Sequence, residues 1–235
     1  MGKDVIEVET DAKGRFVERK NRFLGTVDID GKVVEVHVRD PGRLEEILYE
    51  GNEVLVKKAK SKDRKTNWDL IAGKVKDNWI FVNSGYHREI TEGVLEDEEI
   101  SPYPGAGNIT PEVQLGESRI DFLLERDGER IWMEVKGCTL AEDGVALFPD
   151  APTERGKRHV EELRKAMEKG DRAVLLVLVF RPDAKCFAPK ESTDPEFSEV
   201  FRKAVEEGME VYPLKFSFED DMLRYVSEIP VCNFV

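Results

Sequence analysis

Short apolar and alternating segments separated by turn residues fill the first eighty residues of the chain. The predicted strands are residues 5–8, 23–29, 32–38, 53–58, 68–75 and 79–83. Asp30–Gly31, between the second and third, is a hairpin signal because both positions of a tight turn favour positive φ. DPGRLEEILYEG (40–51) predicts one short helix, with Asp40 as N-cap, Pro41 in the first turn and Gly51 as its stop. This pattern is typical of a small closed barrel. An OB-fold is the natural candidate, although SH3-like barrels share the pattern.

From residue 117 the pattern changes to a mixture of strands and helices. Residues 84–112 before it are predicted to be a connection, with a helix at about 88–98 followed by an irregular stretch rich in Pro and Gly. The elements predicted after it are strands at 118–125, 130–137, 145–148, 173–180 and 210–216, and helices at 153–169 and 195–207. AVLLVLVF (173–180) is apolar throughout, which indicates a strand buried on both faces of a mixed sheet. The chain is therefore predicted to be α/β, of the α+β kind, with an OB-fold-like domain over 1–83 and a second domain over 84–235.

The two strands around Asp127–Gly128 carry the strongest candidate chemistry. A two-residue turn there sets Asp121 opposite Glu134 and Arg119 opposite Lys136. Directly opposed residues share a face, with Cβ atoms about 4.5–5.5 Å apart, so Asp121, Glu134 and Lys136 converge. The other face then receives six apolar side chains: Ile120, Phe122, Leu124, Ile131, Met133 and Val135. Because the turn alone determined the register, this apolar face is an independent check on it.

Two opposed carboxylates repel each other unless a cation neutralises them, and Mg²⁺ (or Mn²⁺) is a hard cation that prefers such ligands. A bound ion of this kind polarises phosphoryl oxygens and lowers the pKa of bound water. Lys136 could orient that water or stabilise developing charge. Glu112 is a further candidate metal ligand beside Asp121 and Glu134. The pattern indicates phosphodiester hydrolysis. The alternative is a surface strand pair in which Lys136 only neutralises its neighbours.

The distribution of charge matters more than the net charge of −13. Residues 1–83 hold 17 Lys and Arg against 16 Asp and Glu, and residues 84–235 hold 19 against 33. KKAKSKDRK (57–65) is a basic run, HVRDPGR (37–43) brings arginines to a predicted helix start, and the helix at 153–169 has basic residues on one side. The candidate nucleic-acid contacts are Arg39, Arg43, Lys57, Lys58, Lys60, Arg64, Lys65, Arg155 and His159. The alternatives are solvated loops, a fixed turn and i,i+4 ion pairs.

Other features of the sequence narrow the class of protein. Cys138, Cys186 and Cys232 are widely spaced, so a disulfide framework is unexpected and the thiols are predicted to be buried and inert. The longest apolar run, 173–180, is far shorter than the ~20 residues of a membrane-spanning helix, and the N-terminus has no signal-like apolar core. A soluble, cytoplasmic protein without a membrane partner is expected. Charged residues make up 36% of the chain and glutamine occurs only at Gln114, a bias typical of thermophile proteins.

Six segments of the chain together resemble the sugar fermentation stimulation protein family, SfsA. They are NRFLG (21–25), HVRDPGRLEEIL (37–48), DRKTNWDL (63–70), GESRIDFLL (116–124), MEVKGCTL (133–140) and FPDAPTERGKRHVEEL (148–163). The resemblance implies an N-terminal OB-like domain and a restriction-endonuclease-like PD-(D/E)xK domain, with Asp121, Glu134 and Lys136 as the nuclease-type triad. It also implies DNA as the partner and a link to regulation of sugar-catabolic genes. Two residues, Cys138 and His87, depart from the pattern expected for the family. His87 stands about where an asparagine is usual, so the resemblance implies no asparagine role at this position.

These observations favour a DNA-binding protein with a Mg²⁺-dependent endonuclease-type site. The alternative is a non-catalytic DNA-binding regulator that keeps the nuclease fold as a scaffold. A third hypothesis, an OB module that binds an oligosaccharide or small effector, rests only on the tolerance of the fold. The preferred DNA sequence and strand stay open. So does the oligomeric state, for which a homodimer is one possibility because nucleases of this architecture often act in pairs.

Overall fold

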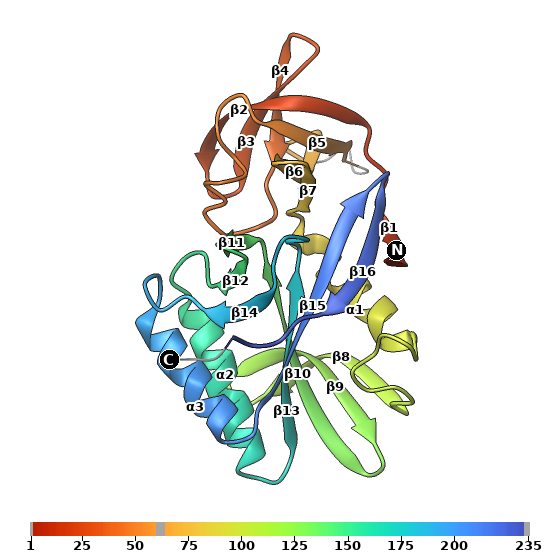
Figure 1. The fold of residues 1–235 in the computed structure, drawn as a ribbon, viewed down its shortest axis with the longest axis vertical. Helices are drawn as coiled ribbons and strands as arrows, with labels where there is room; N and C mark the ends of the chain where they lie inside the picture. Colours follow the sequence, from red (N-terminus) through yellow and green to blue (C-terminus); the bar gives the residue numbers. More distant parts are fainter. Residues whose placement is uncertain (1, 60–63, 233–235) are drawn as a thin grey trace.

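A five-stranded closed barrel forms the upper part of the molecule in Figure 1. The computed structural model describes residues 2–59 and 64–232. The barrel strands are β2 (Ala12–Asn21), β3 (Leu24–Ile29), β4 (Lys32–His37), β5 (Glu53–Lys58) and β6 (Trp68–Val75). Neighbouring strands are antiparallel except β4 and β6, which pair in parallel at Val36↔Trp68 and close the barrel. This order of strands confirms the predicted OB-like barrel.

Turn chemistry determined the β3–β4 hairpin, as predicted. Asp30 and Gly31 both have positive φ, 51° and 81°, and Ile29 pairs with Lys32 directly behind the turn. The sequence pattern did not reveal β2. Only Gly14 and Phe16 of that strand are fully buried inside the barrel, while its charged residues point to solvent, so its apolar signal is weak.

The predicted helix at 40–51 is wrong, because this segment forms turns. The Asp40 carboxylate accepts a hydrogen bond from Gly42 N at 2.8 Å, which closes a local Asx turn in place of a helix cap. Leu44 then adopts a φ of +56°, which no right-handed helix allows. Leu44 and Ile47 are completely buried. Burial of these side chains in the barrel core outweighs the helical propensity of the segment.

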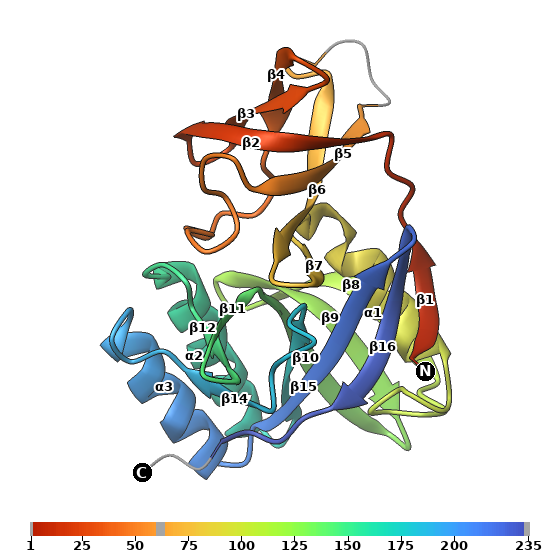
Figure 2. The same cartoon turned by 45° about the horizontal axis from the view of Figure 1, so that its top comes forward.

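A mixed sheet forms the second half of the molecule, below the barrel in Figures 1 and 2. Its strands run in the order β7 (Asn78–Phe81), β15 (Glu210–Glu219), β13 (Arg172–Val179), β10 (Glu129–Cys138), β9 (Ser118–Arg126) and β8 (Asn108–Leu115). In addition, β15 pairs with β16 (Met222–Glu228), and β16 pairs with β1 (Lys3–Glu7). A small sheet of β11 (Leu140–Glu142), β12 (Val145–Phe148) and β14 (Cys186–Pro189) lies beside it. As predicted, β13 is central, because it is parallel to both β10 and β15.

Helices cover both faces of this sheet. A short 3-10 helix, η1 (Ser84–Tyr86), leads into α1 (His87–Glu96), while α2 (Glu154–Met167) and α3 (Pro195–Glu206) pack together on the other face (Figure 2). Both helices begin at a side-chain cap: Thr153 accepts a hydrogen bond from Gly156 N, and Asp194 accepts one from Phe197 N. The helices found in residues 2–59 and 64–232 are all too short or too polar to span a membrane.

The sequence reasoning misjudged two strands of this sheet. It missed β8 as a strand, and it assigned β1 to the other domain. β8 falls in the stretch expected to be irregular, because Pro111 lies within it, and proline is tolerated on an edge strand where no ladder hydrogen bond is lost. β1 belongs to the segment assigned to the first domain, yet it pairs with β16 of the second. The chain therefore starts in the large sheet, passes through the barrel and returns at β7.

The prediction that the cysteines form no disulfide is wrong. Cys186 and Cys232 are joined, with Cα atoms 5.3 Å apart. A parallel bridge between Phe187 and Val231 brings the two segments together. Cys138 is free and buried, and burial raises the pKa of its thiol. The expectation of an inert buried thiol is thus met by Cys138 alone.

Candidate active site

The β9–β10 hairpin has the predicted register. Asp127 and Gly128 have φ values of 53° and 83°, and the pairing runs from Arg126↔Glu129 to Phe122↔Met133. Beyond that pair the ladder ends, because the Asp121 carboxylate takes the next backbone donor, accepting a hydrogen bond from Val135 N at 2.8 Å.

Five of the six residues predicted to share an apolar face do lie in one core cluster: Phe122, Leu124, Ile131, Met133 and Val135. The prediction for Ile120 is wrong, since it lies in the other cluster with Trp132 and Leu163. Regular pairing has already stopped at Asp121. The residue across from it on β8, Glu112, has a left-handed φ of 56°, so the strand geometry changes at this point.

Glu134 is the most buried acid of the site, with 2% of its surface exposed. Its Oε1 atom accepts hydrogen bonds from Lys136 Nζ and from His159 Nδ1, the latter at 2.5 Å. Its Oε2 atom is buried and has no hydrogen-bond partner in the described part of the chain. One carboxylate oxygen is thus fixed by two donors while the other is left without one, an arrangement that costs free energy unless a ligand satisfies it.

His159 lies on α2 and positions Glu134. Arg155 Nε donates to His159 Nε2 at 3.2 Å, so this nitrogen is the acceptor and the proton lies on Nδ1, facing Glu134. Only 2% of the His159 surface is exposed. Both ring nitrogens therefore have protein partners, and the side chain acts on Glu134, whereas the sequence suggested a contact with phosphate.

The two carboxyl groups have opposite pKa shifts. Burial, followed by the neighbouring charge of Glu134, raises the pKa of Asp121 to about 6, against the opposing effects of Val135 N–H and Lys136. Burial also acts to raise the pKa of Glu134, but the charge of Lys136 and the hydrogen bond from His159 outweigh it and hold this pKa below its usual value. Asp121 thus carries most of the cost of placing two acids together.

Glu112 is near this pair but not joined to it. Its side chain is half exposed and pairs with Arg119 at 3.4 Å. Within residues 2–59 and 64–232, no three acids, histidines or cysteines are close enough, as they stand, to hold one ion. The acids that face each other are Asp121 and Glu134. The role of Glu112 as a metal ligand stays a prediction that requires its carboxylate to leave Arg119.

A cavity of about 680 Å³ connects these acids with the barrel. Asp121, Glu134 and Lys136 line one wall, and the β2–β3 turn and the start of the 40–51 segment line the other. The charged side chains of its lining are Arg22, Arg39, Asp40, Arg88, Glu112, Asp121, Glu134, Lys136, Asp150 and Arg155. Acids and bases are equal in number, so the cavity alone is close to neutral when all are ionised.

The basic residues predicted to contact nucleic acid do not gather in one place. Arg39 and Arg155 line the cavity. The other described candidates do not line it: Arg43, Lys57, Lys58, Arg64, Lys65 and His159. Arg64 is held by Asp69, with donor–acceptor distances of 2.6 and 2.8 Å, and Arg39 approaches the same carboxylate at 3.6 Å. Lys60 lies outside the described residues, so the structure does not test the centre of the predicted basic run.

Several cavity residues were missed by sequence reasoning. Arg22, Phe23 and Asp150 line it, and no local spacing singles them out. His87 was noted only as a departure from the family pattern. Its ring stacks on Phe180 at 5.6 Å, and burial followed by the charge of Lys136 lowers its pKa to about 4, so it is a neutral imidazole at ordinary pH.

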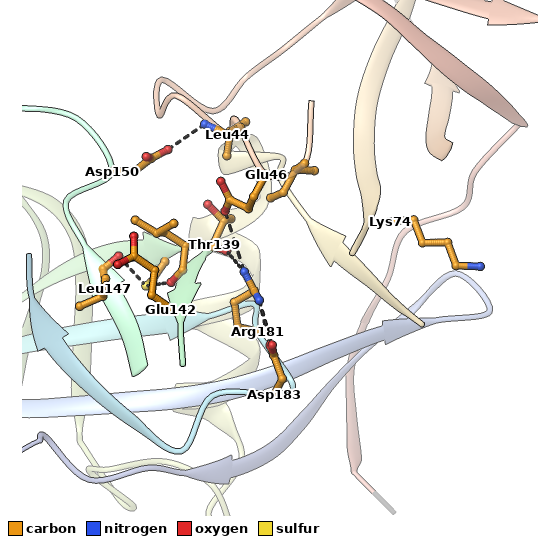
Figure 3. A network of polar contacts seen from close by, with 12 residues as sticks. Leu44, Glu46, Lys74, Thr139, Glu142, Leu147, Asp150, Arg181 and Asp183 are labelled. Carbon is orange, nitrogen blue, oxygen red and sulfur yellow. Dashed lines mark hydrogen bonds and ion pairs between the residues drawn. The ribbon is translucent and has the colours of Figure 1, made fainter. Parts of the chain in front are cut away.

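Asp150 also joins the two halves of the molecule (Figure 3). Its carboxylate accepts a hydrogen bond from Leu44 N of the barrel segment at 2.8 Å. Nearby, Arg181 makes a two-point contact with Asp183, donates to Thr139 O, and lies 3.9 Å from Glu46 of the same barrel segment. These contacts hold the barrel side of the cavity against the wall that carries the acids.

Comparison with known proteins gives concordant matches over nearly the whole chain. The SfsA N-terminal OB domain matches residues 17–82, and the sugar fermentation stimulation protein RE domain matches residues 85–222. A sugar fermentation stimulation protein homolog of Methanococcoides burtonii is 45% identical over 97% of this chain and 95% of its own length. A homolog of Methanothermobacter thermautotrophicus is 46% identical over 88% and 86%. The solved structure of Pyrococcus furiosus SfsA in complex with Ca²⁺ matches with a TM-score of 0.91 at 28% identity, covering 98% of this chain and 99% of that one.

Proposed function

Because the chain belongs to the sugar fermentation stimulation protein (SfsA) family, we propose that it binds DNA and hydrolyses its phosphodiester bonds with a divalent cation, Mg²⁺ or Mn²⁺. Asp121 and Glu134 would hold the cation, and the cavity between barrel and sheet would receive the DNA backbone. The observation that carries this proposal is the buried Glu134 Oε2 atom, which has no hydrogen-bond partner in the described part of the chain.

The donor set fits a hard divalent cation. Carboxylate oxygens are the ligands that Mg²⁺ and Mn²⁺ prefer, and Glu134 Oε2 is a buried anionic oxygen in need of a partner. The raised pKa of Asp121 also fits a bound cation. The charge of Glu134 contributes to this shift, and a positive ion between the two acids would remove their repulsion. The related structure from Pyrococcus furiosus holds Ca²⁺, a cation with the same preference for oxygen. When bound, such a cation supplies Lewis-acid polarisation of the phosphoryl oxygens and a more acidic water.

The protein's own side chains then have separate tasks. His159 holds Glu134 Oε1 through its Nδ1 proton and so directs Oε2 toward the cation position. Lys136 is half-buried on the same wall, where its ammonium would stabilise charge that develops on the phosphate oxygens. Arg155 and Arg39 line the same cavity and would position the phosphates on either side. Because the lining charges cancel, binding of the DNA backbone is expected to depend on the cation.

A cleavage assay tests the proposal directly. The full-length protein is incubated with single-stranded, duplex and branched DNA in EDTA, Mg²⁺ or Mn²⁺, beside the variants Glu134→Gln and Asp127→Asn. The second variant makes a comparable carboxylate-to-amide change at the exposed hairpin turn, where the side chain is 88% exposed. Cleavage in Mg²⁺ or Mn²⁺ that is lost in EDTA and in Glu134→Gln, but kept in Asp127→Asn, supports the enzyme.

Binding of DNA without cleavage under every metal condition would instead favour the alternative, a regulator that uses the nuclease fold as a scaffold. One observation favours that alternative: Glu134 Oε1 already accepts hydrogen bonds from Lys136 and His159, and the ammonium of Lys136 balances the charge of this carboxylate. Calorimetric titration with Mn²⁺ separates the two. An enzyme requires a site that Glu134→Gln abolishes, whereas a scaffold requires none.

A further inference from the structure

Phe23 is an exposed aromatic residue on the wall of the cavity that faces the acids. It lies in the turn between β2 and β3, with 48% of its surface exposed, and it lines the same cavity as Asp121, Glu134 and Lys136. Tyr49, the other large exposed aromatic residue of the described chain, does not line the cavity. An apolar ring that is exposed to water beside a polar site indicates a binding position for a ligand that covers the ring.

The turn that carries Phe23 is held rigidly. Phe23 N donates to Asn21 Oδ1 at 3.0 Å, and Phe23 O accepts from Val38 N at 3.0 Å. The preceding residue, Arg22, is fixed as well: its carbonyl accepts from Arg19 Nη2 at 2.7 Å, and its Nε donates to Pro41 O at 3.1 Å. The ring is therefore presented by a prearranged backbone, which lowers the entropy cost of binding.

A planar cation lies over this ring. The Arg22 guanidinium lies 5.5 Å from the centre of the Phe23 ring, within the range of a cation–π contact. An aromatic face next to an arginine is a combination that single-strand-binding grooves use, the ring stacking on a base and the cation contacting the backbone. A base engaged in a duplex keeps both of its faces stacked on neighbouring base pairs. Only an unpaired or extruded base can lie flat on such a ring.

We propose that Phe23 and Arg22 form a stacking platform for one unpaired nucleobase, and that the nucleic acid taken up by the cavity is single-stranded at this point. This inference rests on the proposed function, because it places the base on the barrel wall while its phosphate faces Asp121 and Glu134. The cavity volume of about 680 Å³ is in the range of a pocket for a small ligand, and so has room for one nucleobase.

Binding of short fluorescent oligonucleotides to the full-length protein tests the platform. Fluorescence anisotropy measures the affinity for oligo-dT, for an abasic strand of the same length and charge, and for a hairpin duplex, all in Ca²⁺ with probe integrity checked on a gel. Phe23→Ala is expected to weaken binding of oligo-dT at least about fivefold, as for the loss of one stacked base. Phe23→Trp is expected to restore it. Tyr49→Ala, which removes an exposed aromatic ring outside the cavity, is the matched control and should bind as the unmodified protein does.

The outcomes separate this inference from the proposed function. Equal affinity of Phe23→Ala and the unmodified protein for oligo-dT, or equal affinity of the unmodified protein for oligo-dT and the abasic strand, overturns the platform even if metal-dependent cleavage is found. Loss of oligo-dT affinity in Phe23→Ala, with abasic binding unchanged and no cleavage of any DNA, keeps the platform and rejects the nuclease. Tighter binding of the duplex than of oligo-dT, unaffected by Phe23→Ala, also overturns the platform.

Discussion

Replacing Asp121 by asparagine is expected to stabilise the metal-free protein. The carboxyl of Asp121 is half-buried beside Glu134, and these two conditions raise its pKa from 3.8 to about 6. An asparagine at this position carries no charge, yet its side-chain oxygen can still accept the hydrogen bond from Val135 N. The substitution therefore removes an electrostatic cost and keeps the backbone contact.

The size of the effect follows from the pKa shift. Each pKa unit corresponds to about 1.36 kcal/mol, so a shift of this size sets a ceiling of about 3 kcal/mol. Solvent screening of a partly exposed carboxyl reduces this to an expected gain of about 1 to 2 kcal/mol. For a chain of this length, such a gain raises the melting temperature by roughly 2–8 °C.

The gain has a defined dependence on pH. Because the folded-state pKa of Asp121 lies above that of the unfolded chain, the folded protein binds the proton more tightly, and the unmodified protein loses stability as pH rises from about 4 to about 6. Asp121→Asn avoids this loss. Its advantage should be close to zero at pH 4, grow through pH 6 and level off above it. Asp40, whose pKa is also about 6, titrates in both proteins and cancels in the difference.

Thermal melts in EDTA between pH 4 and pH 8 measure this difference, with Asp127→Asn as the control that should show no gain at any pH. Repeating the melts in Mg²⁺ is expected to reverse the order, because a cation that binds only the folded protein stabilises the chain that keeps both carboxylates. No gain for Asp121→Asn at pH 8 in EDTA, or a gain of equal size at pH 4, would refute the view that burial of Asp121 beside Glu134 destabilises the metal-free protein.

Three further predictions concern the disulfide, the histidine and the acid limb of activity. Cys186→Ser, which breaks the bond to Cys232 across 46 residues, should lower the free energy of unfolding by about 2 to 4 kcal/mol; a reductant should destabilise the unmodified protein equally and the variant not at all. His159→Leu leaves Glu134 without one of its two donors and should weaken Mn²⁺ binding roughly 10- to 100-fold in calorimetric titrations, and an unchanged affinity would contradict its positioning role. Cleavage at subsaturating Mg²⁺ should fall about tenfold per pH unit below pH 6, because protonated Asp121 cannot hold the cation, whereas a flat rate from pH 5 to pH 8 would rule this out.

The local geometry of the site could be predicted because few backbone solutions exist for it. A two-residue turn at Asp127–Gly128 determines the register of the strands on both sides, and with it the approach of Asp121 to Glu134. The same reasoning failed at Ile120, which lies in the other core cluster and not on the predicted apolar face. The Asp121 side chain competes for the Val135 backbone donor, and no alternation of apolar residues reports such a contact.

Features that depend on distant segments could not be predicted. The segment 40–51 contains good helix signals, yet Leu44 is turned into the barrel core by neighbours from other strands. Helical periodicity places His159 on one side of α2, but only the folded chain shows that Glu134 faces it. In the same way, spacing along the sequence gave no reason to join Cys186 to Cys232. The two cysteines are brought together by the β-bridge between Phe187 and Val231, which connects segments that are distant in the sequence.

The pairing of β1 with β16 has a consequence for synthesis of the chain. Residues Lys3–Glu7 are synthesised long before their partner strand Met222–Glu228. The barrel strands in between can close as soon as they are made, since the pairings that close the barrel all lie within residues 12–75. The strand β1 must therefore stay without its partner until the residues of β16 have been made. Its short length and the charges of Lys3, Asp4 and Glu7 suit that wait, because charged, short edges resist pairing with other nascent chains.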